Sequence, residues 1–452
     1  MEKDKLFGTD GIRGEFGEWP LTEEVVYNIS LAISAWIRKK HKNKIKVVIG
    51  KDTRRSGSKI EQILASGFKR AGVKVYSAGV IPTPGLAYLT NTMDVELGVM
   101  ISASHNPWRD NGIKFFKHNG FKLSEKEERA IERIAFPLIL GKNTKPRINK
   151  ITLQKTSPET YMEHLKNCVK GLDLSGKRIV ADCANGAVSD YAQRLFETFG
   201  AKVFVINNKP DGLNINLNCG SLHPEGMADM VREKKADIGF SFDGDGDRVI
   251  LSNEKGKVLD GDFIMSLIAR HFLQRKCLRN STVVATSMSN FGLEKFLEAI
   301  NVRLIRADVG DKYVLEELIK NKASFGGEQS GHIIFLEHAT TGDGMLSALE
   351  VLQAMQREQK KISRLSAGLK KYPQLIKNVR VTHKKDFKKM PEVLKKIVEA
   401  EQKLKNNGRL VMRYSGTEPL ARIMVEGQNK REIKMIADSI ACAIENELGE
   451  SK

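Results

Sequence analysis

The chain has 452 residues, of which 41% are hydrophobic and 29% charged, an ordinary composition for a globular protein. This length exceeds what one hydrophobic core serves, so we expect three or four domains. No apolar run approaches the roughly 20 residues that cross a bilayer, and the charged N-terminus does not resemble a signal peptide. The five scattered cysteines, without C-x-x-C spacing, predict reduced thiols in the cytoplasm, with neither disulfides nor a zinc site.

The formal net charge of +19 first suggests a nucleic-acid partner. The sequence contains no zinc-finger, RRM or basic-zipper pattern, however, and only 7% of its residues are aromatic and could stack on bases. A basic surface attracts an anionic small substrate equally well. We therefore expect neither a nucleic-acid nor a membrane partner.

Short apolar runs alternate with amphipathic helical patterns through most of the chain, which is typical of α/β units with largely parallel sheets. The predicted strands are residues 46–50, 73–77, 97–102, 178–182, 202–206, 237–242, 282–285 and 302–306. Helical patterns between them include residues 60–71 and 191–199. Loops rich in Gly, Asn, Ser or Pro follow many of these strands and carry the motifs described next.

The last eighty or so residues show a different pattern, which predicts a smaller α+β domain after residues 372–373. A lysine-rich helix ends at residues 406–408 (NNG). Its apolar side is expected to hold Val393, Leu394, Ile397 and Val398. Two strands follow, at residues 409–412 and 421–426, and a final helix runs to about Leu448.

Two loops near the N-terminus carry candidate functional groups. Residues 7–14 (FGTDGIRG) form a glycine-rich loop with Arg13, although a frayed terminus has the same appearance. Residues 101–107 (ISASHNP) end an apolar strand with Ser104 and His105, and a proline then forces a turn. Ser104 as a nucleophile and a merely hydrogen-bonded polar turn both stay open, because the hydrolase pattern Gly-x-Ser-x-Gly is absent. Neighbouring strand residues point to opposite faces, so His105 need not contact Ser104.

Residues 243–248 (DGDGDR) place Asp243, Asp245 and Asp247 at alternate positions beyond a predicted strand, with Arg248 directly after them. Carboxylates this close repel unless a cation lies among them, and Mg²⁺ or Ca²⁺ prefers such oxygen ligands. A solvated Asp-Gly turn is the alternative. An EF-hand is excluded, because its sixth loop position needs glycine and here is Arg248, and because a strand precedes the loop.

Two further loops suit sugar and phosphate ligands. Residues 326–332 (GGEQSGH) hold Glu328, Ser330 and His332; if extended, the first two face the same way and suit neighbouring sugar hydroxyls. Residues 413–419 (RYSGTEP), with Arg422 after them, offer guanidinium, hydroxyl and backbone N–H donors for a phosphate. For both loops a structural turn is the alternative.

In the order and content of these loops, the chain resembles the α-D-phosphohexomutase superfamily, and within it the bacterial phosphoglucosamine mutase branch. The resemblance runs from Phe7 to Gly427, and the ordered set is far more specific than any single loop. Gln329, residues 309–311 (VGD) and residues 211–216 (DGLNIN) favour the glucosamine branch.

The resemblance implies three similar α/β domains with mixed or parallel sheets and a smaller C-terminal α+β domain around a central cleft. The expected ranges are 1–153 with the phosphoserine loop, 154–256 with the metal loop, 257–372 with the sugar loop and 373–452 with the phosphate loop. It also implies isomerisation of glucosamine 6-phosphate to glucosamine 1-phosphate, on the route to UDP-N-acetylglucosamine and cell-wall precursors. The resemblance further suggests a cytoplasmic enzyme that forms a homodimer.

The roles of individual residues follow from the same resemblance. It implies a phosphorylated Ser104, a bisphosphorylated hexose as intermediate and activator, and one Mg²⁺ per chain held by Ser104, Asp243, Asp245 and Asp247. The basic groups around the transferring phosphoryl group are expected to be Arg13, His105, Lys114 and Arg248, with Lys114 or His105 moving the proton. The sugar is expected at Glu328, Ser330 and His332. The phosphate that does not react is expected at Arg413, Ser415, Gly416, Thr417 and Arg422.

Some positions depart from the pattern common among relatives, namely Leu222, Asp308, Lys312 and the pair Trp108 and Arg109. None is a metal or phosphoserine position, but they bear on substrate preference. A phosphomannomutase or phosphoglucomutase is therefore the alternative within the superfamily. A non-catalytic phosphosugar- or nucleic-acid-binding protein is the alternative from another class, and the intact Ser104 and three acids speak against it.

Overall fold

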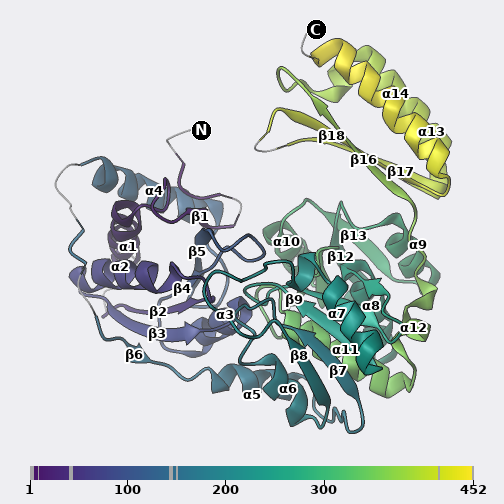
Figure 1. Cartoon of the computed structure of the whole chain (residues 1–452). Coiled ribbons are helices and arrows are strands. Elements are labelled where there is room, and N and C mark those ends of the chain that lie inside the picture. The colour runs from purple at the N-terminus through teal and green to yellow at the C-terminus, as the bar shows by residue number, and fades with distance from the viewer. Residues whose placement is uncertain are drawn as a thin grey trace.

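The computed structural model describes residues 5–8, 10–39, 44–141, 146–148, 151–415 and 418–449. Four sheets follow one another along the chain, and Figure 1 shows the last of them set apart from the other three. None of the helices in these residues has the length and apolarity needed to span a bilayer.

The first sheet has six strands in the order β1-β5-β4-β2-β3-β6. They are β1 (Ile12–Glu15), β2 (Lys46–Lys51), β3 (Lys74–Val80), β4 (Leu97–Ile101), β5 (Asp110–Lys117) and β6 (Gln154–Lys155). β5 runs antiparallel to β4 and β1, whereas β2, β3, β4 and β6 are parallel. Strand residues alternate between faces, so Val47 and Ile49 pack under α1 (Glu23–Arg38), α2 (Gly57–Arg70) and α4 (Glu125–Leu140), while Val48 packs under α3 (Thr83–Thr92).

The second and third sheets share one hydrophobic core, which runs from Tyr161 to Leu369. The second has the order β11-β10-β9-β7-β8 and the third β13-β12-β14-β15. Their strands are β7 (Arg178–Asp182), β8 (Lys202–Ile206), β9 (Ile238–Phe242), β10 (Val249–Asn253), β11 (Val258–Leu259), β12 (Thr282–Thr286), β13 (Arg303–Ala307), β14 (Phe325–Gly327) and β15 (Ile333–Phe335). Their helices are α5 (Glu159–Cys168), α6 (Ala192–Thr198), α7 (Glu225–Lys234), α8 (Gly261–Gln274), α9 (Phe291–Ala299), α10 (Asp311–Asn321), α11 (Gly344–Glu358) and α12 (Ile362–Leu365).

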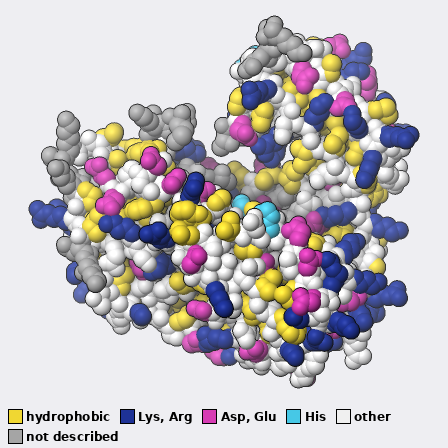
Figure 2. Space-filling view, in the orientation of Figure 1, with side chains coloured by type: hydrophobic (Ala, Val, Ile, Leu, Met, Phe, Trp, Pro, Cys, Tyr) yellow, Lys and Arg dark blue, Asp and Glu magenta, His cyan; other side chains and the backbone are white. Residues whose placement is uncertain are grey.

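The fourth unit is a three-stranded antiparallel sheet with its own core. It consists of β16 (Gln374–Arg380), β17 (Gly408–Tyr414), β18 (Leu420–Gly427), α13 (Pro391–Leu404) and α14 (Lys430–Leu448). Figure 2 shows the surface hollowed between this unit, at the upper right, and the rest of the molecule.

The predicted α/β class with a smaller C-terminal α+β unit is confirmed. Two strands cross the expected ranges, since β6 belongs to the first sheet and β11 to the second. The predicted apolar side of α13 is wrong in part: Val393 is buried, but Leu394 and Val398 are 37% and 44% exposed. The helix packs on a single small sheet beside α14, so only a narrow stripe of it, with Ala400 and Leu404, reaches the core.

Helices α1 and α2 approach most closely at Gly67, where a Cβ atom would lie 1.8 Å from Ser30 Oγ and 2.8 Å from the Tyr27 carbonyl oxygen. Ser30 is buried and its hydroxyl donates to that carbonyl (2.6 Å), so it cannot give way cheaply. We expect Gly67→Ala to destabilise the first unit by about 1–3 kcal/mol, seen as a lower Tm in scanning fluorimetry. Gly226→Ala in α7 is the control, because its Cβ would meet no atom within 4 Å and alanine favours a helix. Equal Tm values for the two variants would contradict this reading.

Candidate active site

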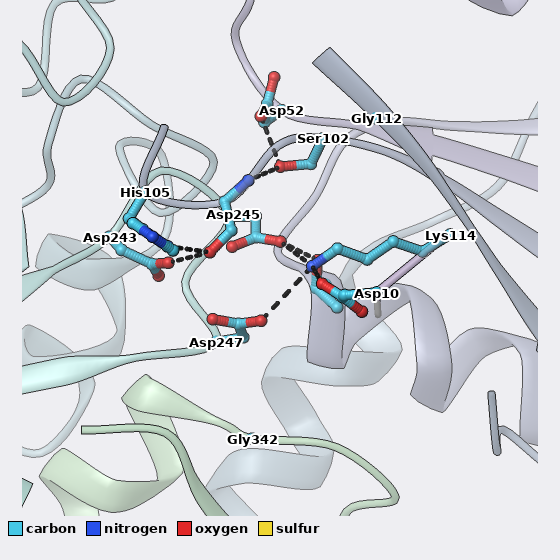
Figure 3. Close-up of polar contacts among 12 residues, drawn as sticks. Asp10, Asp52, Ser102, His105, Gly112, Lys114, Asp243, Asp245, Asp247 and Gly342 are labelled. Atoms are coloured by element: carbon cyan, nitrogen blue, oxygen red, sulfur yellow. Dashed lines mark hydrogen bonds and ion pairs between the residues drawn. The ribbon is translucent and has the colours of Figure 1, made fainter. Parts of the chain in front are cut away.

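Ser104 lies in the turn that follows β4, with a φ of 54° in the left-handed region that few non-glycine residues adopt. Its buried hydroxyl donates to Asp243 Oδ2 (2.6 Å), across from the first unit to the second. The same hydroxyl oxygen is 3.3 Å from His105 Nδ1. The two side chains thus meet, unlike neighbours on an extended strand, because the backbone turns at Ser104. Figure 3 shows His105 and Asp243 on the same side of the cluster.

The Ser104 turn is held from behind by Arg54, whose side chain is fully buried. The guanidinium donates to the backbone carbonyls of Ser104, Asn106, Pro107 and Asp110. Asp52 fixes this guanidinium through Nε (2.9 Å) and also accepts from the Ser102 hydroxyl (2.6 Å), which in turn accepts from the Ser104 N–H. The sequence analysis missed Asp52 and Arg54. Their position directly after the predicted strand 46–50, at the edge where Ser104 also lies, was the available signal.

Asp243, Asp245 and Asp247 lie on the turn between β9 and β10, all buried, with one ligand oxygen of each within 4.8 Å of the others. Burial, together with the charges of Asp247 and Asp245, raises the pKa of Asp243 well above its usual range. Asp245 Oδ1 and Asp247 Oδ1 are buried without a hydrogen-bond partner. Orphaned carboxylate oxygens beside a buried hydroxyl fit a hard divalent cation, so this cluster can hold a metal ion.

Lys114 approaches the acids from the side opposite His105 (Figure 3), because β5 lies beside β4. Its Nζ is 2.9 Å from Asp245 Oδ2, 3.5 Å from Asp247 Oδ2 and 3.1 Å from Asp10 Oδ2. Burial acts against the charged form, but these three carboxylates raise the pKa of Lys114, which therefore stays an ammonium. Burial and the neighbouring Arg248 instead lower the pKa of His105 to about 4, so its ring is neutral.

Asp10 was not predicted, yet it organises the cations on this side of the cluster. Its Oδ2 lies 2.5 Å from Arg13 Nη2, and its Oδ1 lies 2.5 Å from Lys122 Nζ. Lys122 also pairs with Asp311 of the third unit (2.5 Å), so one ammonium joins two units. The fold of the first unit brings Lys114 and Lys122 to Asp10 from distant positions in the sequence, and its packing on the third unit adds Asp311.

Arg248 and His332 connect the acid turn to residues 326–332, named the sugar loop from here on. Arg248 N–H donates to Asp243 Oδ1 (3.1 Å), while its Nε is buried without a hydrogen-bond partner. His332 Nδ1 faces Asp247 Oδ1 at 3.6 Å, and its Nε2 accepts from the Gly342 N–H (2.9 Å). That hydrogen bond places the ring proton on Nδ1, toward Asp247.

The sugar loop is a tight turn and not the extended segment considered above, because the Gly331 N–H donates to the Glu328 carbonyl (3.0 Å). The two side chains still converge: Ser330 Oγ donates to Glu328 Oε2 (3.2 Å), and the Gly310 N–H approaches Glu328 Oε1 at 3.3 Å. They line a cavity of about 450 Å³ together with Leu222, Met288 and Val309.

Arg413 and Arg422 stand directly opposite each other in the β17–β18 ladder, on what we call the arginine face. Burial and the neighbouring Arg422 lower the pKa of Arg413, and Arg422 Nε is buried without a hydrogen-bond partner. Like charges in such a pair are destabilising unless anions lie beside them. The Glu418 carboxylate, 2.8 Å from Arg422 Nη2, offsets part of this charge, and a bound anion would offset more. Ser415 is buried beside them, while Gly416 and Thr417 fall outside the described residues. These groups lie on the fourth unit, apart from the Ser104 cluster (Figure 1).

Comparison with known proteins gives one consistent answer. Four phosphoglucomutase/phosphomannomutase family models match the chain: α/β/α domain I at residues 4–138, α/β/α domain II at 159–256, α/β/α domain III at 260–372 and the C-terminal domain at 376–443. The phosphoglucosamine mutase of Geobacter sp. (strain M21) is 46% identical over 98% of both chains. That of Geotalea uraniireducens (strain Rf4) is 46% identical over 99% of both.

Solved structures agree in fold. A phosphoglucomutase/phosphomannomutase family protein from Burkholderia thailandensis aligns with a TM-score of 0.80 at 22% identity, covering 99% of this chain and 98% of that one. The N-acetylphosphoglucosamine mutase of Aspergillus fumigatus, in complex with GlcNAc-6P and magnesium, aligns with a TM-score of 0.67 at 17% identity, covering 93% and 96%.

Replacing one acid tests the metal capacity of the cluster. We expect Asp245→Asn to weaken divalent-cation binding by at least about tenfold in calorimetric titration with Mg²⁺ or Mn²⁺, because a charged ligand becomes a neutral one of the same shape. Thr83 and Lys114 can still donate to the amide oxygen, so the fold should hold. Asp229→Asn, on the exposed face of α7, is the control. Unchanged affinity in Asp245→Asn would mean that the acids do not bind the cation.

Proposed function

Because the chain belongs to the phosphoglucomutase/phosphomannomutase family, we propose that it interconverts glucosamine 6-phosphate and glucosamine 1-phosphate through a phosphorylated Ser104. One structural observation carries the chemistry: the Ser104 hydroxyl lies 2.6 Å from Asp243, within a buried group of three carboxylates that can hold a metal ion. The choice of glucosamine rests on relatives 46% identical over nearly the whole chain.

Mg²⁺ is the cation that best suits this site in the proposal, with Asp243, Asp245, Asp247 and an oxygen of phospho-Ser104 as its ligands. When bound, it neutralises charge on the phosphoryl group in transit. Lys114 fixes two of these acids in place, and the buried Arg248 Nε, which has no hydrogen-bond partner, lies 3.8 Å from Asp247 Oδ1.

In the forward step, the bond between phosphorus and the Ser104 oxygen breaks while a bond to a hydroxyl of the hexose phosphate forms. The sugar hydroxyl loses its proton and Ser104 gains one. The neutral His105 ring can accept the proton that the sugar hydroxyl loses, and the Lys114 ammonium can donate the proton that Ser104 gains. The resulting bisphosphorylated hexose then turns over, so that its other phosphate returns to Ser104.

The sugar loop and the arginine face position the substrate. Glu328 and Ser330 accept and donate hydrogen bonds at the sugar hydroxyls, with His332 behind them. Arg413, Arg422 and Ser415, together with Gly416 and Thr417, bind the phosphate that is not reacting, as the paired guanidinium groups favour. The product would supply UDP-N-acetylglucosamine and cell-wall precursor synthesis.

Removing the nucleophile tests the reaction. We expect Ser104→Ala to lower mutase turnover by at least about a thousandfold, with the bisphosphorylated hexose supplied as activator, because no group remains to carry the phosphoryl group. Intact mass spectrometry should find one added phosphoryl group on the wild type and none on the variant. The exposed Ser175→Ala serves as the control. Retained turnover in Ser104→Ala would refute a phosphoserine mechanism.

Comparing substrates tests the glucosamine assignment. We expect kcat/KM for glucosamine 6-phosphate to exceed that for glucose 6-phosphate and mannose 6-phosphate by about tenfold or more, since a site that binds a specific polar substituent discriminates strongly against its replacement. All three are measured in one coupled assay with the same activator. A preference for mannose 6-phosphate would instead assign the protein to the phosphomannomutases.

A further inference from the structure

Asn290 lies between the third and fourth units and is only 2% exposed. Its Nδ2 donates to the Tyr372 carbonyl (3.0 Å) and to Glu426 Oε1 (2.9 Å). Its Oδ1 accepts from the Tyr372 N–H and from the Gly292 N–H at the start of α9 (2.9 Å each). Every hydrogen-bonding position of the amide is therefore used. Tyr372 belongs to the linker before β16. Asn290 therefore binds the N–H and the carbonyl of one linker residue, as a neighbouring strand would.

Asp262 connects this junction to the sugar loop. Its carboxylate is fully buried in the first turn of α8, and its Oδ2 accepts from the Asn290 N–H (3.0 Å) and from Gln329 Nε2 (2.9 Å). Lys371, next to Tyr372 in the linker, lies 3.4 Å from the same oxygen. The Gly261 N–H also donates to the Gln329 carbonyl (2.9 Å), so the sugar loop is seated on the start of α8.

Glu426 connects the junction to the arginine face. It pairs across the ladder with Arg409, which also donates to the Ser289 carbonyl of the third unit (2.5 Å). Two pairs further along the same face, Arg413 stands opposite Arg422. At about 3.3 Å per residue, the arginine pair lies roughly 13 Å from this anchored end. The strands are rigid over such a length, so the anchor decides where the arginines point.

We propose that Asp262 and Asn290 are positioning residues that set the spacing between the sugar loop and the arginine face. The path runs from Gln329 through Asp262 and Asn290 to Glu426, through hydrogen bonds that are part-buried at Gln329 and buried from Asp262 onward. This inference rests on the proposed function, since it assigns the two ends of one hexose phosphate to these two sites. A ligand that must bridge both is bound tightly only when their spacing is fixed beforehand.

Two variants break the path. Asn290→Ser keeps a side-chain oxygen to cap α9, but is too short to reach Tyr372 and Glu426. Asp262→Ala removes the oxygen that accepts from both Asn290 and Gln329. We expect each to raise KM for glucosamine 6-phosphate about three- to tenfold, with a smaller change in kcat and with Mg²⁺ affinity unaltered. The double variant should raise KM no further than the stronger single one, because both changes interrupt the same path.

Ser363→Ala is the control, because it removes another contact between units, the part-buried hydrogen bond to Glu254, that lies off this path. Its KM should equal that of the wild type. Unchanged KM in folded Asn290→Ser, or effects that multiply in the double variant, would overturn the proposal.

A readout independent of turnover separates this proposal from the proposed function. Hydrogen exchange at residues 326–332 and at Tyr372 should quicken in Asn290→Ser, whether or not the wild type is a mutase. Faster exchange at Tyr372 with unchanged exchange in the sugar loop would show that Asn290 only holds the linker and does not affect the sugar loop. That result would also overturn the proposal.

Discussion

The hydrogen bond between Ser104 and Asp243 joins the first unit to the second, and the arrangement of the site depends on it. The acceptor, Asp243, is one of three carboxylates buried together on one turn, and their burial is unfavourable unless positive charge surrounds them. Lys114 supplies one such charge from β5, and Arg248 supplies another from the same turn as the acids. The two orphaned oxygens of Asp245 and Asp247 leave room for a further cation. The antiparallel β5 in an otherwise largely parallel sheet is what brings Lys114 to this edge.

Contacts between units explain why the site is assembled from loops far apart in the sequence. The second and third units share a core, so the acid turn and the sugar loop have a fixed relation, seen in the bridge between Arg248 and His332. The first unit is tied to them by polar contacts, including Lys122 to Asp311 and Thr83 to Asp245. The fourth unit has its own core and contacts the third mainly through its linker and one end of its sheet.

The sequence predicted what local patterns determine. Strands β7 and β8 were found with their observed bounds, because each is a short apolar run between turn residues. The Ser104 turn, the acid turn and the sugar loop, which were also singled out, contact one another. Arg54 and Asp10 were missed because most of their partners lie far away in the sequence, although in the same unit. Asn290 was missed because its partners belong to the linker and the fourth unit. Leu394 was misplaced for a related reason, since the width of the buried stripe on α13 depends on how little sheet it covers.

Negative charges are grouped at one end of the proposed substrate path and positive charges at the other. Three acids beside Ser104 favour a cation, and Arg413 opposite Arg422 favours an anion. The acids lie in a unit that shares its core with the third, and phosphoryl transfer needs such precise positioning. The arginines belong to a unit with a separate core, which is joined to the third unit at the Asn290 junction. In the proposed mechanism, a bisphosphorylated hexose that turns over would present either phosphate to the same arginines, so the chemistry at Ser104 and the binding of the second phosphate would lie on separate units.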